Sequence, residues 1–253
     1  MSFVRVRRMR GNRFDIEWCR YTEMRIVVAA KAVARDLCAD TAEVERVRIR
    51  LAGRARNETL AEATVYCGPR MLRVQLVAGT DSVVRVLAEQ LERKLTCAAD
   101  GVPFWGAGSI DPRLTCASDM KPIVRRKLCH LRRCSPGAAA VDLEAGDYNA
   151  RLFIDADTGE DSVVFRPGIQ SCADPLALGL RRLRTRRPPA EDSAPYLFVV
   201  AAPAAVMTET AAMGELCAKG LATLFFIDDC WRRGRLLYRR YDQRLGLVIP
   251  ISG

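Results

Sequence analysis

A short sequence occurs twice in the second half of this 253-residue chain. Leu152–Arg166 reads LFIDADTGEDSVVFR, and Phe225–Arg239 reads FFIDDCWRRGRLLYR. Aligned without gaps, the two stretches share four identical residues and four further apolar matches, and each is followed later by the tripeptide LGL. A repeat of this kind is one supersecondary unit that buries its apolar face against a neighbouring copy. The repeat therefore predicts two similar small modules.

Both modules are expected to have the same order of elements. The first, residues 123–187, should contain an extended basic segment, a short helix and a β-hairpin. The second, residues 195–253, should contain a strand, a helix that begins after Thr208, and a second hairpin. Because Gly159 and Gly234 do not align, we expect the two hairpin turns to differ.

The first third of the chain predicts a separate domain over residues 13–98, after a basic tail of residues 1–12. Its apolar periodicity changes between about 3.6 and 2 residues and gives the order β-α-β-β-β-α. The first helix is expected to have Thr22 as its N-cap, and the second should cover Asp81–Cys97. Two helices with one apolar face each are buried together against one face of a sheet, so the other sheet face should be open.

The predicted fold class is therefore α+β, with an N-terminal β-α-β-β-β-α two-layer domain followed by two small tandem β-α-β-β-type modules. Residues 99–122 and 188–194 are rich in Gly, Pro, Ser, Ala and acidic residues, and are expected to be linkers. Apolar runs stay shorter than the roughly 18 residues that cross a bilayer, and the N-terminus has no apolar signal segment. We expect a soluble, cytoplasmic protein.

Positive charge is concentrated in the first third of the chain. The net charge is +10, and 35 of the 40 basic residues are arginine, which binds phosphate through two parallel hydrogen bonds. Residues 1–97 hold 19 basic and 12 acidic side chains, whereas residues 188–253 hold seven of each. An arginine-rich composition alone also fits a GC-rich genome. The distribution nevertheless favours a polyanion, RNA or DNA, as the partner of the N-terminal domain.

Sequence motifs for a metal or a cofactor are weak. The ten cysteines form no C-x-x-C pair, and Cys129, His130 and Cys134 lack a second ligand pair at metal-site spacing. We therefore expect neither a metal nor a cofactor.

An enzyme is also not expected from the residues present. The chain has one histidine, no glycine-rich phosphate loop and no G-x-S-x-G motif. Its densest carboxylate cluster lies in and around a hairpin turn, where aspartate is common for backbone reasons: Asp155, Asp157, Glu160 and Asp161.

The order of elements, together with the repeated hairpin, resembles the long ribosome hibernation-promoting factors, and in particular the actinobacterial dormancy-associated members with a tandem C-terminal region. That family has a turn of the Asp-x-x-Thr-Gly-Glu kind, a Val-Val-Tyr-Arg strand and a Gly-Leu-Ile-x-Pro end. The positions that match are Thr158, Gly159, Glu160, Val163, Val164 and Arg166 in the first copy, and Gly246, Leu247 and Pro250 in the second.

The resemblance implies a ribosome-binding protein that is not an enzyme. In this family the N-terminal domain occupies the mRNA and tRNA channel of the small subunit, against 16S rRNA, blocks initiation and protects idle 70S ribosomes. By this likeness the rRNA-binding residues are expected on the helices: Arg25, Lys31, Arg35, Arg85 and Arg93. A second choice is the open sheet face, with Arg46, Arg48, Arg50 and Arg73.

The resemblance also suggests why the module is repeated. Family members with one C-terminal module pair it with a module on another ribosome's factor and so join two 70S ribosomes. Two copies on one chain can instead pair internally, and the chain would then act as a monomer on a single ribosome. We expect Leu152, Val163 and Phe165 to pack near Phe225, Leu236 and Tyr238.

Two alternatives remain open. The first copy can be a decayed spacer, in which case the last module still dimerises ribosomes. The chain can also be a general nucleic-acid-binding regulator that has no special affinity for the ribosome.

Overall fold

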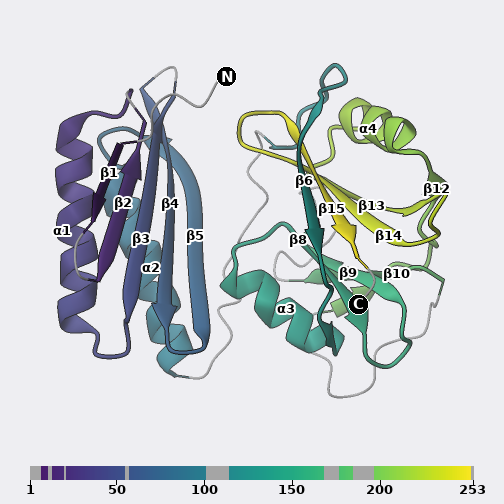
Figure 1. Cartoon of the computed structure of the whole chain (residues 1–253), viewed down its shortest axis with the longest axis horizontal. Helices are drawn as coiled ribbons and strands as arrows, with labels where there is room; N and C mark the ends of the chain where they lie inside the picture. The colour runs from purple at the N-terminus through teal and green to yellow at the C-terminus, as the bar shows by residue number, and fades with distance from the viewer. Residues whose placement is uncertain are drawn as a thin grey trace. The chain divides into compact units, whose positions relative to one another are not determined.

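The computed structural model describes residues 7–10, 13–19, 21–54, 57–100, 114–167, 177–184 and 197–251. The chain folds into an N-terminal and a C-terminal unit, which are described separately (Figure 1). The four helices and three separate sheets in the described residues confirm the predicted α+β class. Among these residues, no helix is both long and apolar enough to cross a membrane.

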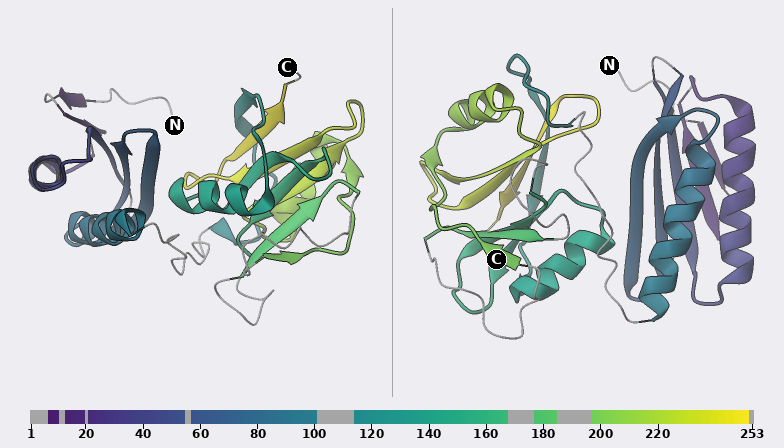
Figure 2. Two further views of the ribbon diagram at one scale, coloured as in Figure 1. Left: turned by 90° about the horizontal axis from the view of Figure 1, so that it is seen from below. Right: turned by 180° about the vertical axis from the view of Figure 1, so that it is seen from behind.

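The N-terminal unit is one five-stranded sheet with two helices. The sheet order is β1-β2-β3-β4-β5, and only the β2–β3 pair is parallel. Figure 2 shows both helices on the same face of this sheet, as the sequence predicted. The elements are β1 (Arg7–Arg10), β2 (Phe14–Trp18), α1 (Met24–Asp40), β3 (Arg46–Gly53), β4 (Glu58–Cys67), β5 (Arg70–Gly79) and α2 (Val83–Ala99).

Alternating and helical patterns in the sequence converge on one apolar core between the helices and the sheet. Val47, Ile49 and Leu51 alternate along β3 and are almost fully buried, whereas the arginines between them lie on the other face. Helix α1 contributes Ile26, Val27, Ala30, Ala34 and Leu37, and α2 contributes Val83, Leu87 and Leu91.

Two predictions for this domain are wrong. Residues 7–10, predicted to be part of a basic tail, form β1, which pairs antiparallel with β2, and Met9 packs against the core. Thr22 is not the N-cap of α1, because Glu23 holds that position. The Thr22 hydroxyl instead binds the end of β3, where it lies 3.4 Å from the Leu51 carbonyl oxygen and accepts from Gly53 N.

The C-terminal unit contains two five-stranded sheets, each accompanied by one helix (Figure 1). The first C-terminal sheet has the order β11-β10-β9-β8-β7, and the second has the order β12-β13-β14-β15-β6. The elements are β6 (Ile123–Cys129), β7 (Arg133–Cys134), α3 (Pro136–Ala145), β8 (Ala150–Asp155), β9 (Asp161–Phe165), β10 (Leu178–Arg182), β11 (Leu197–Val199), β12 (Val206–Met207), α4 (Glu209–Ala218), β13 (Thr223–Asp228), β14 (Gly234–Arg239) and β15 (Leu245–Pro250).

The two sheets exchange their first strands. β6, from the first stretch of chain, pairs in parallel with β15 of the second C-terminal sheet. β11, from the second stretch, pairs in parallel with β10 of the first C-terminal sheet. The sheets therefore do not follow the stretches 123–187 and 195–253 expected from the sequence. The expected linker at 188–194 lies outside the described residues.

Part of the expected linker at 99–122 packs against the second C-terminal sheet and its helix. Leu114 is buried with Ala222 and the partly buried Tyr241. Ser118 N donates to Cys217 O of α4, and Leu245 N donates to Pro122 O. Residues 114–122 are therefore part of the C-terminal unit, whereas residues 101–113 lie outside the described part of the chain.

The repeated LGL tripeptide has the same structural role in both copies. Gly179 is the cross-strand partner of Phe165, and Gly246 is the partner of Tyr238. A Cβ atom at either glycine would lie within 2.3 Å of the partner's ring. Glycine therefore leaves the space in which an aromatic ring covers the neighbouring strand, and the pair fixes the register of the two strands.

The two hairpin turns also share one geometry, so the expectation that they differ is wrong. Asp155 N donates to Glu160 O and Gly159 N donates to Asp155 O; the second turn repeats both bonds at the positions aligned with these, from Asp228 N to Arg233 O and from Arg232 N to Asp228 O. Gly159 has φ +71° and Arg232 has φ 55°. Arginine thus occupies a left-handed position for which glycine is better suited.

This conformation predicts opposite effects of substitution in the two turns. Gly159→Ala should lower the free energy of unfolding by about 1 kcal/mol, because it adds a Cβ to a left-handed residue. Arg232→Gly should raise the free energy of unfolding by about 0.5 kcal/mol, since relief of strain exceeds the added chain entropy. Urea unfolding of the full chain measures both changes. An alanine at position 159 that costs nothing would contradict the shared turn geometry.

Candidate nucleic-acid interface and the interface between the modules

The cations predicted on the N-terminal helices differ in exposure. The side chains of Arg25 and Arg85 are 63% and 68% exposed, and Arg35 and Arg93 are also exposed. Lys31 is only half-exposed, because it lies at the border between the solvent side of α1 and its buried side. Four of the five predicted helix cations are therefore exposed to solvent.

Carboxylates accompany these cations. Arg25 makes ion pairs with Glu23 at 2.7 Å and with Asp81 at 2.6 Å. The hydrogen bond to Glu23, followed by the charge of Asp81, raises the pKa of Arg25. Arg85 pairs with Glu89 one turn along α2. Such exposed pairs contribute little to stability because solvent screens them, so a phosphate group can replace the carboxylate.

The open sheet face forms a denser charge network. Arg46 pairs with Asp15, whose side chain is almost fully buried. Arg50 pairs with Glu17 at 2.8 Å, and Glu62 lies between Arg50 and Arg73 at 3.6 and 3.2 Å. Arg48 is half-exposed, and its Nε has no hydrogen-bond partner among the described residues. Arg46, Arg50 and Arg73 are therefore already paired with carboxylates.

A buried apolar cluster joins the two C-terminal sheets. Leu152 and Val163 of the first copy and Phe225 and Leu236 of the second lie in it, and Phe165 packs against it. Leu152 aligns with Phe225 and Val163 with Leu236, so the interface is built from the same positions of both copies. Tyr238 is not part of this cluster; its ring covers Gly246. The cluster is completed by Leu183, Ala204 and Ile227.

An ion pair crosses the same interface. Arg233 of the second copy donates to both carboxylate oxygens of Asp161 in the first copy, at 2.7 and 3.0 Å. Gly234 N donates to the same carboxylate at 2.8 Å. The hydrogen bond to Asp161 raises the pKa of Arg233. In the sequence, Asp161 was expected to serve backbone turn chemistry, and no spacing connects it with Arg233, 72 residues later.

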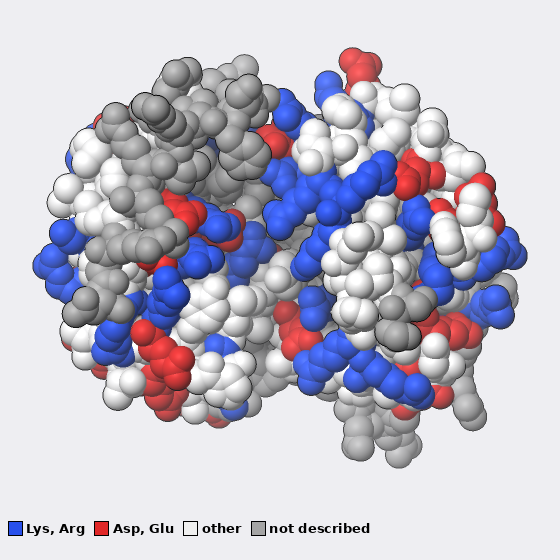
Figure 3. All heavy atoms as spheres, viewed as in Figure 1, with Lys and Arg blue, Asp and Glu red and all other residues white. Residues whose placement is uncertain are grey.

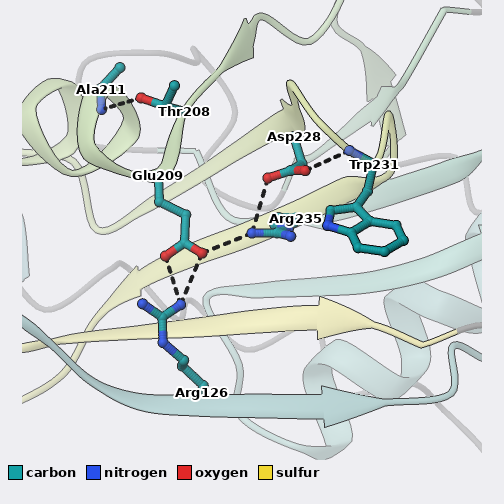
Figure 4. Close-up of polar contacts among 7 residues, drawn as sticks. All are labelled: Arg126, Thr208, Glu209, Ala211, Asp228, Trp231 and Arg235. Atoms are coloured by element: carbon teal, nitrogen blue, oxygen red, sulfur yellow. Dashed lines mark hydrogen bonds and ion pairs between the residues drawn. The ribbon is translucent and has the colours of Figure 1, made fainter.

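The aligned aspartates Asp155 and Asp228 have different cation partners. Asp155 pairs with Arg182 at 2.5 Å, and both side chains are fully buried. Asp228 accepts from Trp231 N at 2.8 Å and pairs with Arg235 at 3.0 Å (Figure 4). Asp155 therefore ties its turn to β10, and Asp228 ties its turn to β14.

The described residues bring together one group of three possible metal ligands, and it is not the one considered in the sequence. Asp228, Asp229 and Cys230 have ligand atoms within 4.8 Å of one another on the second turn. Asp229 and Cys230 are exposed, and the Asp228 carboxylate is already occupied by Trp231 N and Arg235. Exposed acidic groups of this kind are common in turns, so we assign no metal to this group.

Comparison with known proteins agrees with the repeat and its surroundings. Residues 119–168, from the segment before β6 to the end of the first hairpin, match the family described as Sigma 54 modulation/S30EA ribosomal protein C terminus. A dormancy associated translation inhibitor from Mycobacterium tuberculosis, found in two strains, is 36% identical over 214 residues, which cover 81% of this chain and 76% of the relative. The chain belongs to the long hibernation-promoting factor family. The family resemblance inferred from the order of elements and the repeated hairpin is therefore confirmed.

The ion pair across the interface predicts that Asp161 stabilises the C-terminal unit. Asp161→Ala should lower the free energy of unfolding by about 3 kcal/mol, because Arg233 and the buried Gly234 N lose their acceptor. Asp157→Ala, an exposed aspartate in the same turn, is the matched control and should change it by less than about 0.5 kcal/mol. Equal effects of the two substitutions on urea unfolding would show that the ion pair contributes little.

Proposed function

We propose that this chain is a ribosome hibernation factor. Its N-terminal domain would bind 16S rRNA in the mRNA and tRNA channel of the small subunit, inhibit translation and protect idle 70S ribosomes in the cytoplasm. The identity to a dormancy associated translation inhibitor across 81% of the chain is the observation that carries this proposal. A rigid two-layer domain with a net positive charge is suited to bind a fixed RNA shape through its phosphates, and this action needs no catalytic step.

The helix side of the N-terminal domain is the proposed first contact with rRNA. Its cations are more exposed than those of the sheet face, and their ion pairs are the weak, solvated kind that a phosphate can displace. Arg46, Arg48, Arg50 and Arg73 on the sheet face are the second proposed contact, where the buried Asp15 and the partly buried Glu62 compete for the same guanidinium groups.

We propose further that the two C-terminal modules pair within one chain and that the protein is a monomer on the ribosome. Full burial of a large apolar side chain stabilises by about 1.5–3 kcal/mol, so exposing the seven buried residues of the interface would cost on the order of 10 kcal/mol. The exchange of β6 and β11 adds backbone hydrogen bonds that would also break. A covalent tether gives an effective concentration in roughly the millimolar range, above that of a second chain in solution.

The two alternatives predict different behaviour. A factor that dimerises ribosomes through its last module needs the face formed by Phe225 and Leu236, which in this chain is buried against the first copy. A general nucleic-acid binder would bind bulk DNA as well as it binds ribosomes at the same salt concentration. Internal pairing and selective ribosome binding are therefore the two properties that distinguish the proposed function.

Charge reversal on the helices tests rRNA binding. Arg25→Glu combined with Arg35→Glu should weaken binding to 30S subunits at least about tenfold, because two cations that face phosphate become anions. Lys31 is left unchanged because it is half-buried. The measurement is cosedimentation with purified 30S subunits, together with inhibition of a purified translation system.

The matched control is Lys219→Glu with Arg232→Glu, which makes the same change in net charge at exposed positions of the C-terminal unit. It should bind 30S subunits nearly as well as the unchanged chain. A folded helix variant that cosediments and inhibits as well as this control would show that the helix side is not the rRNA contact.

A further inference from the structure

Strand β6 carries exposed cations at the free edge of the second C-terminal sheet. Among the described strands it pairs only with β15, so it is the edge strand of this sheet. Five consecutive residues, Val124 to Leu128, are exposed, and three of them are basic: Arg125, Arg126 and Lys127. Residues 121–133 contain six basic and no acidic side chains. The strand is therefore a local concentration of positive charge outside the N-terminal domain.

Cations from the β14–β15 connection lie next to this strand. Leu245 N donates to Pro122 O, and Arg240 N donates to Arg244 O, so the connection runs beside the start of β6. Figure 3 shows Lys and Arg side chains gathered over this part of the C-terminal unit. The β6 basic surface is defined as Lys121, Arg125, Lys127, Arg240 and Arg244. One carboxylate lies beside it, because Arg240 pairs with Asp242 of the same connection at 3.3 Å.

A charge network holds the middle of β6 in place. Arg126 donates to both oxygens of Glu209 at the start of α4, at 3.0 and 2.6 Å (Figure 4). Glu209 also accepts from Arg235, which in turn pairs with Asp228. Because side chains alternate along a strand, Arg125 and Lys127 project from the face opposite to Arg126.

These two side chains are free to bind a ligand. Arg125 and Lys127 are exposed, and neither makes an ion pair or side-chain hydrogen bond within the described part of the chain. They are two residues apart on one face, separated by about 6.6 Å along the strand. Their backbone is fixed by the ladder to β15, where Arg125 pairs with Gly246 and Lys127 with Val248.

Protection of a sheet edge does not explain this charge. Lysine and arginine on an edge strand often prevent aggregation. However, β11 occupies the same edge position in the first C-terminal sheet, and its residues are Leu197, Phe198 and Val199. The cations at 240 and 244 also lie outside β6. The positive charge is therefore specific to one of two equivalent edges.

We propose that the β6 basic surface binds the phosphate backbone of RNA, as a second RNA contact of the protein in addition to the N-terminal domain. The proposal deepens the proposed function, because on a ribosome this RNA would be rRNA. Arg125 and Lys127, which make no ion pair within the described residues, carry this proposal, because such cations bind phosphate without reading a base sequence. This contact would hold the paired modules against the ribosome while the N-terminal domain occupies its own site.

The test is the salt dependence of binding. Full-length protein with Arg125→Ala and Lys127→Ala should bind naked 16S rRNA and 70S ribosomes more weakly. The slope of log affinity against log salt concentration should fall by about two units, since about one counterion is released per phosphate contact. The loss of affinity should shrink as the salt concentration rises. The matched control, Arg184→Ala with Arg232→Ala, removes two exposed cations elsewhere in the same unit and should keep the slope.

The outcomes separate this inference from the proposed function. An unchanged slope in the folded β6 variant, on both RNA and ribosomes, overturns the inference and leaves the proposed function intact. A loss on ribosomes but not on naked rRNA also overturns it, because the partner is then an acidic protein surface. If the unchanged chain does not bind ribosomes, the proposed function is overturned. The RNA contact of β6 is still supported in that case if the β6 variant shows a reduced salt slope on naked rRNA.

Discussion

The exchange of one strand between the two C-terminal sheets constrains the rest of this unit. β6 completes the sheet of the second copy and β11 completes that of the first, so neither copy has a full sheet of its own. The buried cluster around Phe225 and the ion pair between Asp161 and Arg233 join the same two sheets. A module that dimerises between ribosomes needs a free pairing face. Here that face is already used inside the chain.

The two copies keep the same scaffold but not the same charges. The turn hydrogen bonds and the glycine beside an aromatic ring are common to both, because they set the register of the hairpin. The buried Arg166 of the first copy pairs with Glu144 of α3 at 2.8 Å. In the second copy, the residue of α4 that corresponds to Glu144 is Cys217, which has no carboxylate. The aligned Arg239 donates to Ser118 instead. The second copy therefore depends on residues 114–122, a segment that leads into the basic strand β6.

The sequence predicted the fold class, both helices of the first domain and the repeated hairpins, because local periodicity and turn chemistry determine these features. The strand exchange was not predicted, since the edge to which β6 and β11 add depends on contacts between distant segments. Thr22 satisfied the sequence rule for an N-cap, but its hydroxyl instead binds the end of β3. Tyr238 was expected to pack against the first copy together with Phe225 and Leu236, because all three are apolar positions of the repeated hairpin. Its ring instead covers Gly246, a position that only the pairing of β14 with β15 identifies.

The state of ribosomes bound to the full-length chain tests the central claim most directly. Sucrose-gradient sedimentation of purified 70S ribosomes with the protein separates single ribosomes from pairs. If the modules pair within one chain, the protein should sediment with 70S particles and form no 100S peak, because no pairing face remains for a second ribosome. A 100S peak that appears with the full chain and disappears when residues 195–253 are deleted would contradict internal pairing.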